Sequence, residues 1–225
     1  MIPLKDDNPA RSFPAVTLIV VIANVAAFVY ELLLPPPARD DLIRRMAVVP
    51  VEFAHPHPPY LEVIARDAIS LLTAMFLHGG ALHLLGNMLY LWIFGKNVED
   101  TMGHRRFAVF YLVAGAAGSL VQIAAHPASA VPMIGASGAI AGVLGAYLVL
   151  FPTARVQTLV FLVFFARIVP IPALIVLGVW LLIQVVNAGR IAPGEVAWFA
   201  HLGGFAAGLT LVVLFRRRRP RHSLY

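Results

Sequence analysis

The chain has no cysteine and few charged residues. Of its 225 residues, 12% are charged and 60% are hydrophobic, and the mean hydropathy is +0.83. The absence of cysteine excludes disulfide bonds and thiolate metal sites, and it removes the usual evidence for an oxidising or reducing compartment. The shortage of charge lies outside the range of soluble domains and predicts a protein that crosses the membrane several times.

Charge is missing over one long stretch in particular. No Asp, Glu, Lys or Arg occurs from Phe107 to Ala154, and this stretch is long enough for two passages through a membrane, at about 20 residues each. Apolar runs elsewhere in the chain bring the prediction to six spans. We place them at residues 15–34, 72–94, 107–125, 136–152, 170–188 and 198–215.

One apolar segment fits this pattern poorly. Residues 156–166 cover only about half of a bilayer, and Arg167, Pro170 and Pro172 separate them from the fifth span. We interpret the segment as an interfacial or re-entrant lead-in to that span. A seventh span is the alternative.

The formal net charge is +6, but the basic residues gather at the ends of apolar segments, where they set topology rather than bind nucleic acid. With six spans and both ends inside, twelve basic residues lie on the cytoplasmic side and five on the other. We therefore expect a multi-pass protein of the plasma (inner) membrane with both termini in the cytoplasm. Outside the spans, we expect a short N-terminal tail 1–14, a structured outer loop 35–71 and a basic C-terminal tail 216–225.

Two glycine-rich motifs place a reactive side chain in an apolar segment. Gly135-Ala136-Ser137-Gly138 opens the fourth span, and His201-Leu202-Gly203-Gly204 lies at the start of the sixth. Taken alone, a serine in an apolar helix is most often a packing residue that bonds to its own backbone. A histidine at membrane depth is costly and is a functional residue by default.

The glycines around these two residues favour a direct contact between them. Gly138 and Gly142 are four residues apart, and His201, Gly204 and Gly208 fall on one stripe of a helix. Two such small faces let helix backbones come close together. A Ser–His hydrogen bond near 3 Å, which nucleophilic catalysis needs, is therefore available.

His83 and Asn87 form a third polar element, in the second span. They are four residues apart, so they lie on one helix face, and both side chains can donate hydrogen bonds. Polar groups in an apolar span need partners. They serve either as interhelical contacts or as donors to the oxyanion of an acyl intermediate, and the residues alone leave both readings open.

Taken together, these elements resemble the rhomboid family of intramembrane serine proteases. The resemblance covers about residues 71–214, with the order and spacing of the motifs preserved. The matching pieces are His78-x4-His83-x3-Asn87, Glu99-x3-Gly103, Gly135-Ala136-Ser137-Gly138 and Ala200-His201-x2-Gly204-x3-Gly208. The resemblance implies an all-α polytopic membrane protein with the six-helix rhomboid fold, in which residues 1–225 form a single domain.

The resemblance also implies a role for each motif. Ser137 would be the nucleophile and His201 the general base, without a third acidic residue, while His83 and Asn87 would stabilise the oxyanion. No cofactor and no metal are implied. One position departs from the family, since many relatives carry an aromatic residue that stacks on the histidine where this chain has Ala141.

The implied substrates are single-span or other transmembrane proteins in membrane lipid, with no nucleic acid as a partner and no oligomeric state predicted. The first alternative is a catalytically silent relative that binds transmembrane segments; such relatives usually lack the serine or the histidine, and both are present here. A channel or transporter would carry polar residues through several spans, which the third and fifth spans nearly lack. His-Glu-x-x-His, the zinc-protease motif, does not occur.

Overall fold

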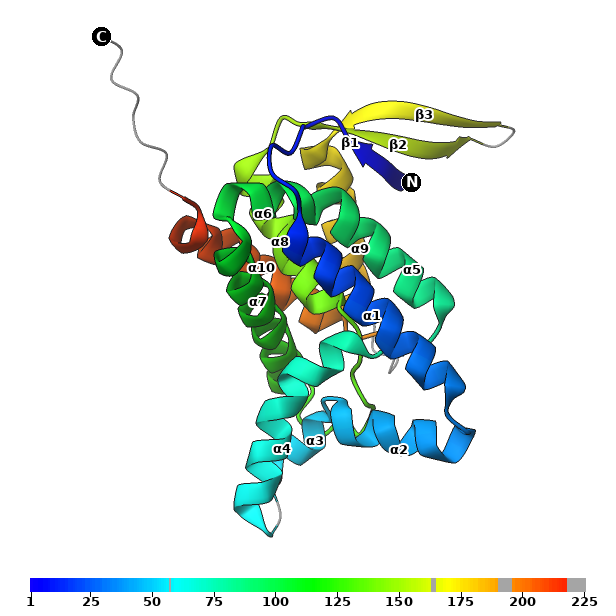
Figure 1. Cartoon of the computed structure of the whole chain (residues 1–225), viewed down its shortest axis with the longest axis vertical. Coiled ribbons are helices and arrows are strands. Elements are labelled where there is room, and N and C mark those ends of the chain that lie inside the picture. The colour runs from blue at the N-terminus through cyan, green and yellow to red at the C-terminus, as the bar shows by residue number, and fades with distance from the viewer. Residues whose placement is uncertain (57, 163–164, 190–195, 218–225) are drawn as a thin grey trace.

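The computed structural model describes residues 1–56, 58–162, 165–189 and 196–217, and these fold into a helical bundle with a small sheet at one end (Figure 1). The helices are α1 (Ala15–Leu33), α2 (Pro36–Met46), α3 (Pro50–Ala54), α4 (Tyr60–Thr73), α5 (Ala81–Tyr90), α6 (Lys96–Met102), α7 (His104–Ala125), α8 (Ser137–Leu150), α9 (Ala173–Ala188) and α10 (Trp198–Phe215). The strands are β1 (Ile2–Asp6), β2 (Arg155–Leu162) and β3 (Phe165–Pro172). A 3₁₀ turn (Ala74–Phe76) follows α4, and a π-helical turn (Leu91–Gly95) joins α5 to α6.

Helix α8 forms the centre of the bundle. Residues 139–147 are all buried, and α7 and α10 pack against this helix and against each other. A helix that is apolar on every face is stable only when neighbours surround it. Ser137, the first residue of α8, therefore opens the most enclosed element of the protein.

Glycines bring the backbones of α8 and α10 into contact. A methyl group added at Gly204 would overlap the carbonyl oxygen of Gly138, and one added at Gly208 would overlap the carbonyl oxygen of Gly142. No residue with a side chain fits at either position without moving a helix. The predicted pairing of two small faces is confirmed.

The helices agree with the predicted helical membrane fold. Among the described residues, α1, α7 and α10 are long and apolar enough to cross a membrane. The predicted span 72–94 is broken, because α4 and its 3₁₀ turn meet the run α5–α6 at an angle of 85°. Helices α8 and α9 have 14 and 16 residues and are shorter than the other three. The count of six spans stays a prediction.

The described residues of the segment 156–166 lie in two β-strands, so the alternative of a seventh helical span is wrong. Its position as an interfacial or re-entrant lead-in stays a prediction. β2 pairs antiparallel with β3, and β1 adds to the other side of β2. The segment is rich in β-branched and aromatic residues, which favour strands, and Pro170 and Pro172 are tolerated because β3 is an edge strand. The expected N-terminal tail is correspondingly ordered as β1, with Ile2 opposite Leu159.

The outer loop 35–71 is structured, as predicted, and contains α2, α3 and most of α4. It holds the segment that leads into α8, because Val48 and Met133 exchange two backbone hydrogen bonds of 3.1 and 2.8 Å. Its expected position on the outer side of the membrane stays a prediction. Of the basic residues that set the predicted topology, Arg190, Arg218, Arg219 and Arg221 lie outside the described residues.

The Glu99-x3-Gly103 turn provides hydrogen-bond acceptors for the start of α1. The buried carboxylate of Glu99 accepts hydrogen bonds from the backbone N–H groups of Val16 and Thr17, each at 2.8 Å, and from the Thr17 hydroxyl at 2.7 Å. Helix α1 has no side-chain cap of its own, so Glu99 satisfies donors that would otherwise be unpaired. Gly103 has φ +79°, which favours glycine, and its N–H bonds to the Glu99 carbonyl.

Candidate active site

Ser137 and His201 are in direct contact. The Oγ atom of Ser137 lies 2.7 Å from Nε2 of His201, a hydrogen-bond distance between residues 64 positions apart in the sequence. Ser137 begins α8 and His201 lies in the first turn of α10, so the glycine-mediated contact of these two helices fixes the separation of the pair. Both side chains are half-buried.

Helix α8, which begins at Ser137, is shorter than a membrane core is thick. Fourteen residues make a helix of about 21 Å, whereas the hydrocarbon core of a membrane is about 30 Å thick. Irregular backbone at 126–136 connects α7 to Ser137. Such backbone is tolerated at membrane depth only where it is enclosed by protein or lines a water-filled cavity.

The start of α10 is held by a side chain from α7. The amide oxygen of Gln122 accepts hydrogen bonds from the backbone N–H groups of Phe199 and Ala200, at 3.0 and 3.2 Å. They belong to the first turn of α10, whose N–H groups lack the regular partners of a helix interior; the Ala200 N–H also bonds to the Ala197 carbonyl at 3.0 Å. Gln122 thereby fixes the turn that carries His201.

His83 and Asn87 approach the loop in front of Ser137. A Cβ atom on Gly135 would lie 2.7 Å from Nε2 of His83 and 3.7 Å from Nδ2 of Asn87. Gly135 has φ +121°, a backbone conformation that side chains other than glycine rarely adopt. The four predicted site residues are therefore brought to one end of α8.

Three polar residues that the sequence analysis did not single out complete this end of the bundle. Gln184 of α9 bonds to His201, Gln122 caps α10, and the buried Glu31 of α1 accepts the backbone N–H of His78 at 3.1 Å. Each is a polar side chain in an apolar segment, which is the signal that marks functional residues in membranes. The sequence does not show which partner each of them finds.

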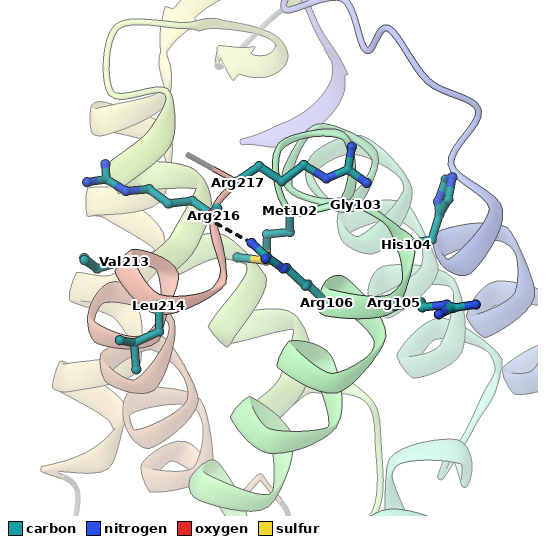
Figure 2. A pocket seen from close by; sticks show the side chains of 9 residues that line it. All are labelled: Met102, Gly103, His104, Arg105, Arg106, Val213, Leu214, Arg216 and Arg217. Atoms are coloured by element: carbon teal, nitrogen blue, oxygen red, sulfur yellow. Dashed lines mark hydrogen bonds between the residues drawn. The ribbon is translucent and has the colours of Figure 1, made fainter. Parts of the chain in front are cut away.

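The described residues contain no group of three or more His, Cys, Asp or Glu side chains able to hold a metal ion. A cavity of about 890 Å³ lies elsewhere, between the start of α7 and the end of α10 (Figure 2). Its wall includes four arginines, and Arg106 donates a hydrogen bond to the backbone carbonyl of Arg216. Twelve residues of α10, about 18 Å, separate His201 from Val213 in this wall, so the cavity is not part of the site around Ser137.

The fold and the clustered polar residues define a multi-pass helical membrane protein. A family model described as the Rhomboid domain matches residues 65–218, more than half of the chain. The chain therefore belongs to the rhomboid family.

Curated relatives agree with this assignment. Rhomboid protein 1, mitochondrial, of Saccharomyces cerevisiae is 34% identical over 150 residues, which cover 63% of this chain and 40% of that protein. RHOMBOID-like protein 1 of Arabidopsis thaliana is 30% identical over 241 residues, covering 95% of this chain and 56% of the relative. Rhomboid protease GluP of Bacillus subtilis is 47% identical over 78 residues, which cover 35% of this chain and 15% of that protein. The matches span about half or less of the length of these relatives.

Proposed function

We propose that this protein is an intramembrane serine endopeptidase that hydrolyses peptide bonds in or near transmembrane segments of other membrane proteins. The observation that carries the proposal is the 2.7 Å contact between Ser137 Oγ and His201 Nε2. It joins a nucleophile and a base on two helices whose backbones touch. Membership of a family that includes a Rhomboid protease supports the same chemistry.

In the proposed reaction, a substrate helix first unwinds locally, because a helix in lipid has its backbone groups paired and its peptide bonds shielded. Ser137 Oγ attacks the exposed carbonyl carbon while His201 Nε2 takes the hydroxyl proton. The tetrahedral intermediate collapses as His201 returns this proton to the leaving amine. Water then attacks the acyl-enzyme, with His201 again acting as the base.

The negative oxygen of the tetrahedral intermediate needs hydrogen-bond donors. The first backbone N–H groups of α8 have no side-chain cap. They lie at the N-terminal end of the helix, where the helix dipole favours negative charge. His83 and Asn87 supply further donors beside Gly135. We propose both as oxyanion-stabilising residues.

The proposal includes the arrangement of the protein in its membrane. Residues 1–225 form a single rhomboid domain with six spans, in the plasma (inner) membrane, with both termini in the cytoplasm. β1 and the end of α10 lie at the same end of the bundle, opposite α2 and α3 (Figure 1), and both contact α6 through hydrogen bonds of Asp6 and Arg217. The partners are transmembrane protein substrates and membrane lipid.

The test is cleavage of a fluorescently tagged single-span substrate by the purified protein in liposomes. Wild-type protein is expected to cleave it, and Ser137→Ala and His201→Ala to be inactive while folding normally. Cleavage by Ser137→Ala would remove Ser137 as the nucleophile. No cleavage by folded wild-type protein, across several substrates with destabilised helices, would contradict the proposal and favour the alternative of a silent family member.

A further inference from the structure

We infer that Gln184 is a positioning residue for His201: its side-chain oxygen holds the imidazole so that Nε2 faces Ser137 without a proton. This inference rests on the proposed function and names a third participant in it. Gln184 lies on α9 and is only 5% exposed. Its Oε1 atom is 2.7 Å from Nδ1 of His201.

The orientation of the Gln184 amide follows from its other contact. Its Nε2 group donates a hydrogen bond of 3.1 Å to the backbone carbonyl of Trp180, one turn earlier in α9. Only the nitrogen of an amide can donate to a carbonyl, so the oxygen must be the atom that faces His201. The carbonyl of Trp180 thus prevents the amide from turning over.

This orientation determines the tautomer of His201. An amide oxygen can only accept, so Nδ1 of the imidazole carries the hydrogen. In a neutral imidazole the other nitrogen, Nε2, is then unprotonated and accepts the hydrogen of the Ser137 hydroxyl. A directed chain of hydrogen bonds therefore runs from Ser137 through His201 and Gln184 to the backbone of α9.

A neutral amide suits a side chain that is buried among apolar helices. A carboxylate in the same place would stabilise the imidazolium formed during the reaction, but burying its charge is costly. In the described part of the chain, no Asp or Glu hydrogen-bonds to His201. Gln184 provides the orienting half of what a triad carboxylate does, without the charge.

Helix α9 also provides an aromatic neighbour for His201. Many relatives make such a contact from the position that is Ala141 in this chain. The ring of Trp180 lies 6.1 Å from that of His201, and Trp198 meets the same imidazole edge-on at 5.9 Å. Ala141 is fully buried, and a Cβ atom added at Gly204 would lie 3.4 Å from its methyl group, so that position serves helix contact. Trp180 and Gln184 are four residues apart and share one face of α9.

A purely structural role for Gln184, as a bond that ties α9 to α10, predicts lower stability and nothing more. The experiment compares wild-type protein with Gln184→Leu, Gln184→Glu and a control, Asn187→Ala, in liposomes from about pH 5 to 9. Asn187 is half-buried, and among the described residues its side chain bonds to the Ile183 carbonyl of its own helix. Turnover, KM and thermal unfolding are measured for each.

Gln184→Leu is expected to lower kcat about tenfold to hundredfold with little change in KM, because the base loses its orientation. Gln184→Glu keeps an acceptor and is expected to retain much of the rate. The rising limb of its kcat–pH curve should move to higher pH, because a carboxylate favours the charged imidazolium. Asn187→Ala should match wild type in every measurement.

A Gln184→Leu variant with wild-type kcat would overturn the inference. So would a loss of kcat that only follows the folded fraction of the protein, together with an unshifted kcat–pH curve in Gln184→Glu. Nitrogen chemical shifts of ¹⁵N-histidine protein, with His201 assigned through His201→Ala, give a test that needs no cleavage. They should report the Nδ1–H tautomer in wild type and a mixture in Gln184→Leu. An inactive wild type with this tautomer would contradict the protease assignment and leave the hydrogen-bond chain intact.

Discussion

The side-chain amide of Asn87 lies 2.9 Å from Nε2 of the buried His78, and the backbone N–H of His78 bonds in turn to the carboxylate of Glu31. The proposed oxyanion donor on α5 is therefore anchored to α1, the first helix of the chain. An amide nitrogen carries two hydrogens. One can bond to His78 while the other remains free for substrate.

This anchoring ranks two substitutions. Asn87→Ala should lower kcat by about 10²–10³, the usual effect of removing an oxyanion donor. His78→Leu leaves the donor in place but unheld, and we expect a loss of about tenfold, in line with one misplaced hydrogen bond. Steady-state kinetics on both variants checks the order. A larger loss in His78→Leu would show that His78 itself contacts the substrate.

Two glycines should respond in opposite ways to the same substitution. Gly208→Ala forces α8 and α10 apart, because the added methyl group overlaps the backbone of Gly142, and overpacking of this kind costs about 1–3 kcal/mol. Gly178→Ala on α9 meets nothing within 4 Å and should hold or raise stability, since alanine favours helix by up to about 1 kcal/mol. Thermal unfolding in detergent measures both. Equal melting temperatures would contradict the close contact of α8 and α10.

Glu99 should matter more to stability than other acidic residues. Glu99→Gln removes the charge that receives three hydrogen bonds at the start of α1, and hydrogen bonds to a charged group are each worth about 1.5–3 kcal/mol. We expect a loss of at least about 2 kcal/mol. Glu52→Gln is the control, because its ion pair with Arg66 is partly exposed and is worth less than about 1 kcal/mol.

Asp6 should make stability depend on pH. Burial is the main cause that raises the pKa of Asp6, which is 2% exposed and accepts hydrogen bonds from Asn8 and Asn97. Because the folded-state pKa lies above the unfolded one, the stabilising effect of the proton is complete below the unfolded pKa. It is lost as the pH rises through the folded value.

Asp6→Asn should therefore melt at a higher temperature than wild type at neutral pH, and the two should converge in acid. Unfolding curves recorded from about pH 4 to 8 measure this difference. A gap that stays constant over the range would show that the carboxyl does not titrate differently in the folded protein. Asp40→Asn, on the exposed surface of α2, is the matched control.

The absence of cysteine makes the predicted topology directly testable. Single cysteines at Leu4 of β1 and at Ala128, between α7 and α8, occupy exposed positions at opposite ends of the bundle. With both termini in the cytoplasm, a membrane-impermeant maleimide should label Ala128→Cys on intact cells and Leu4→Cys only after lysis. The reverse pattern would invert the orientation.

The sequence predicts the contact of α8 with α10 because its evidence is local: Gly204 and Gly208 repeat at helical spacing from His201. The strand pair β2–β3 escaped prediction because a short run of apolar residues fits a buried helix segment as well as a strand. The third strand, β1, lies about 150 residues away in sequence and leaves no local mark. Gln184 is visible as a polar residue in an apolar span. Its pairing with His201 depends on the rotation of α9 and α10 about their axes. Both helices are apolar on all faces, so the spacing of their apolar residues does not predict this rotation.

The backbone contact at Gly138–Gly204 and Gly142–Gly208 has a mechanical consequence. At these two crossings the backbones of α8 and α10 touch with no side chain between them, so we expect the serine and the histidine to move as parts of one stiff body. A membrane that thins or thickens tilts this body as a whole and leaves the distance between the two residues unchanged. We expect sensitivity to lipid thickness to arise at α5 and α9 instead. His83 of α5 lies beside Gly135 and Gln184 of α9 bonds to His201, while both helices expose apolar side chains on their outer faces.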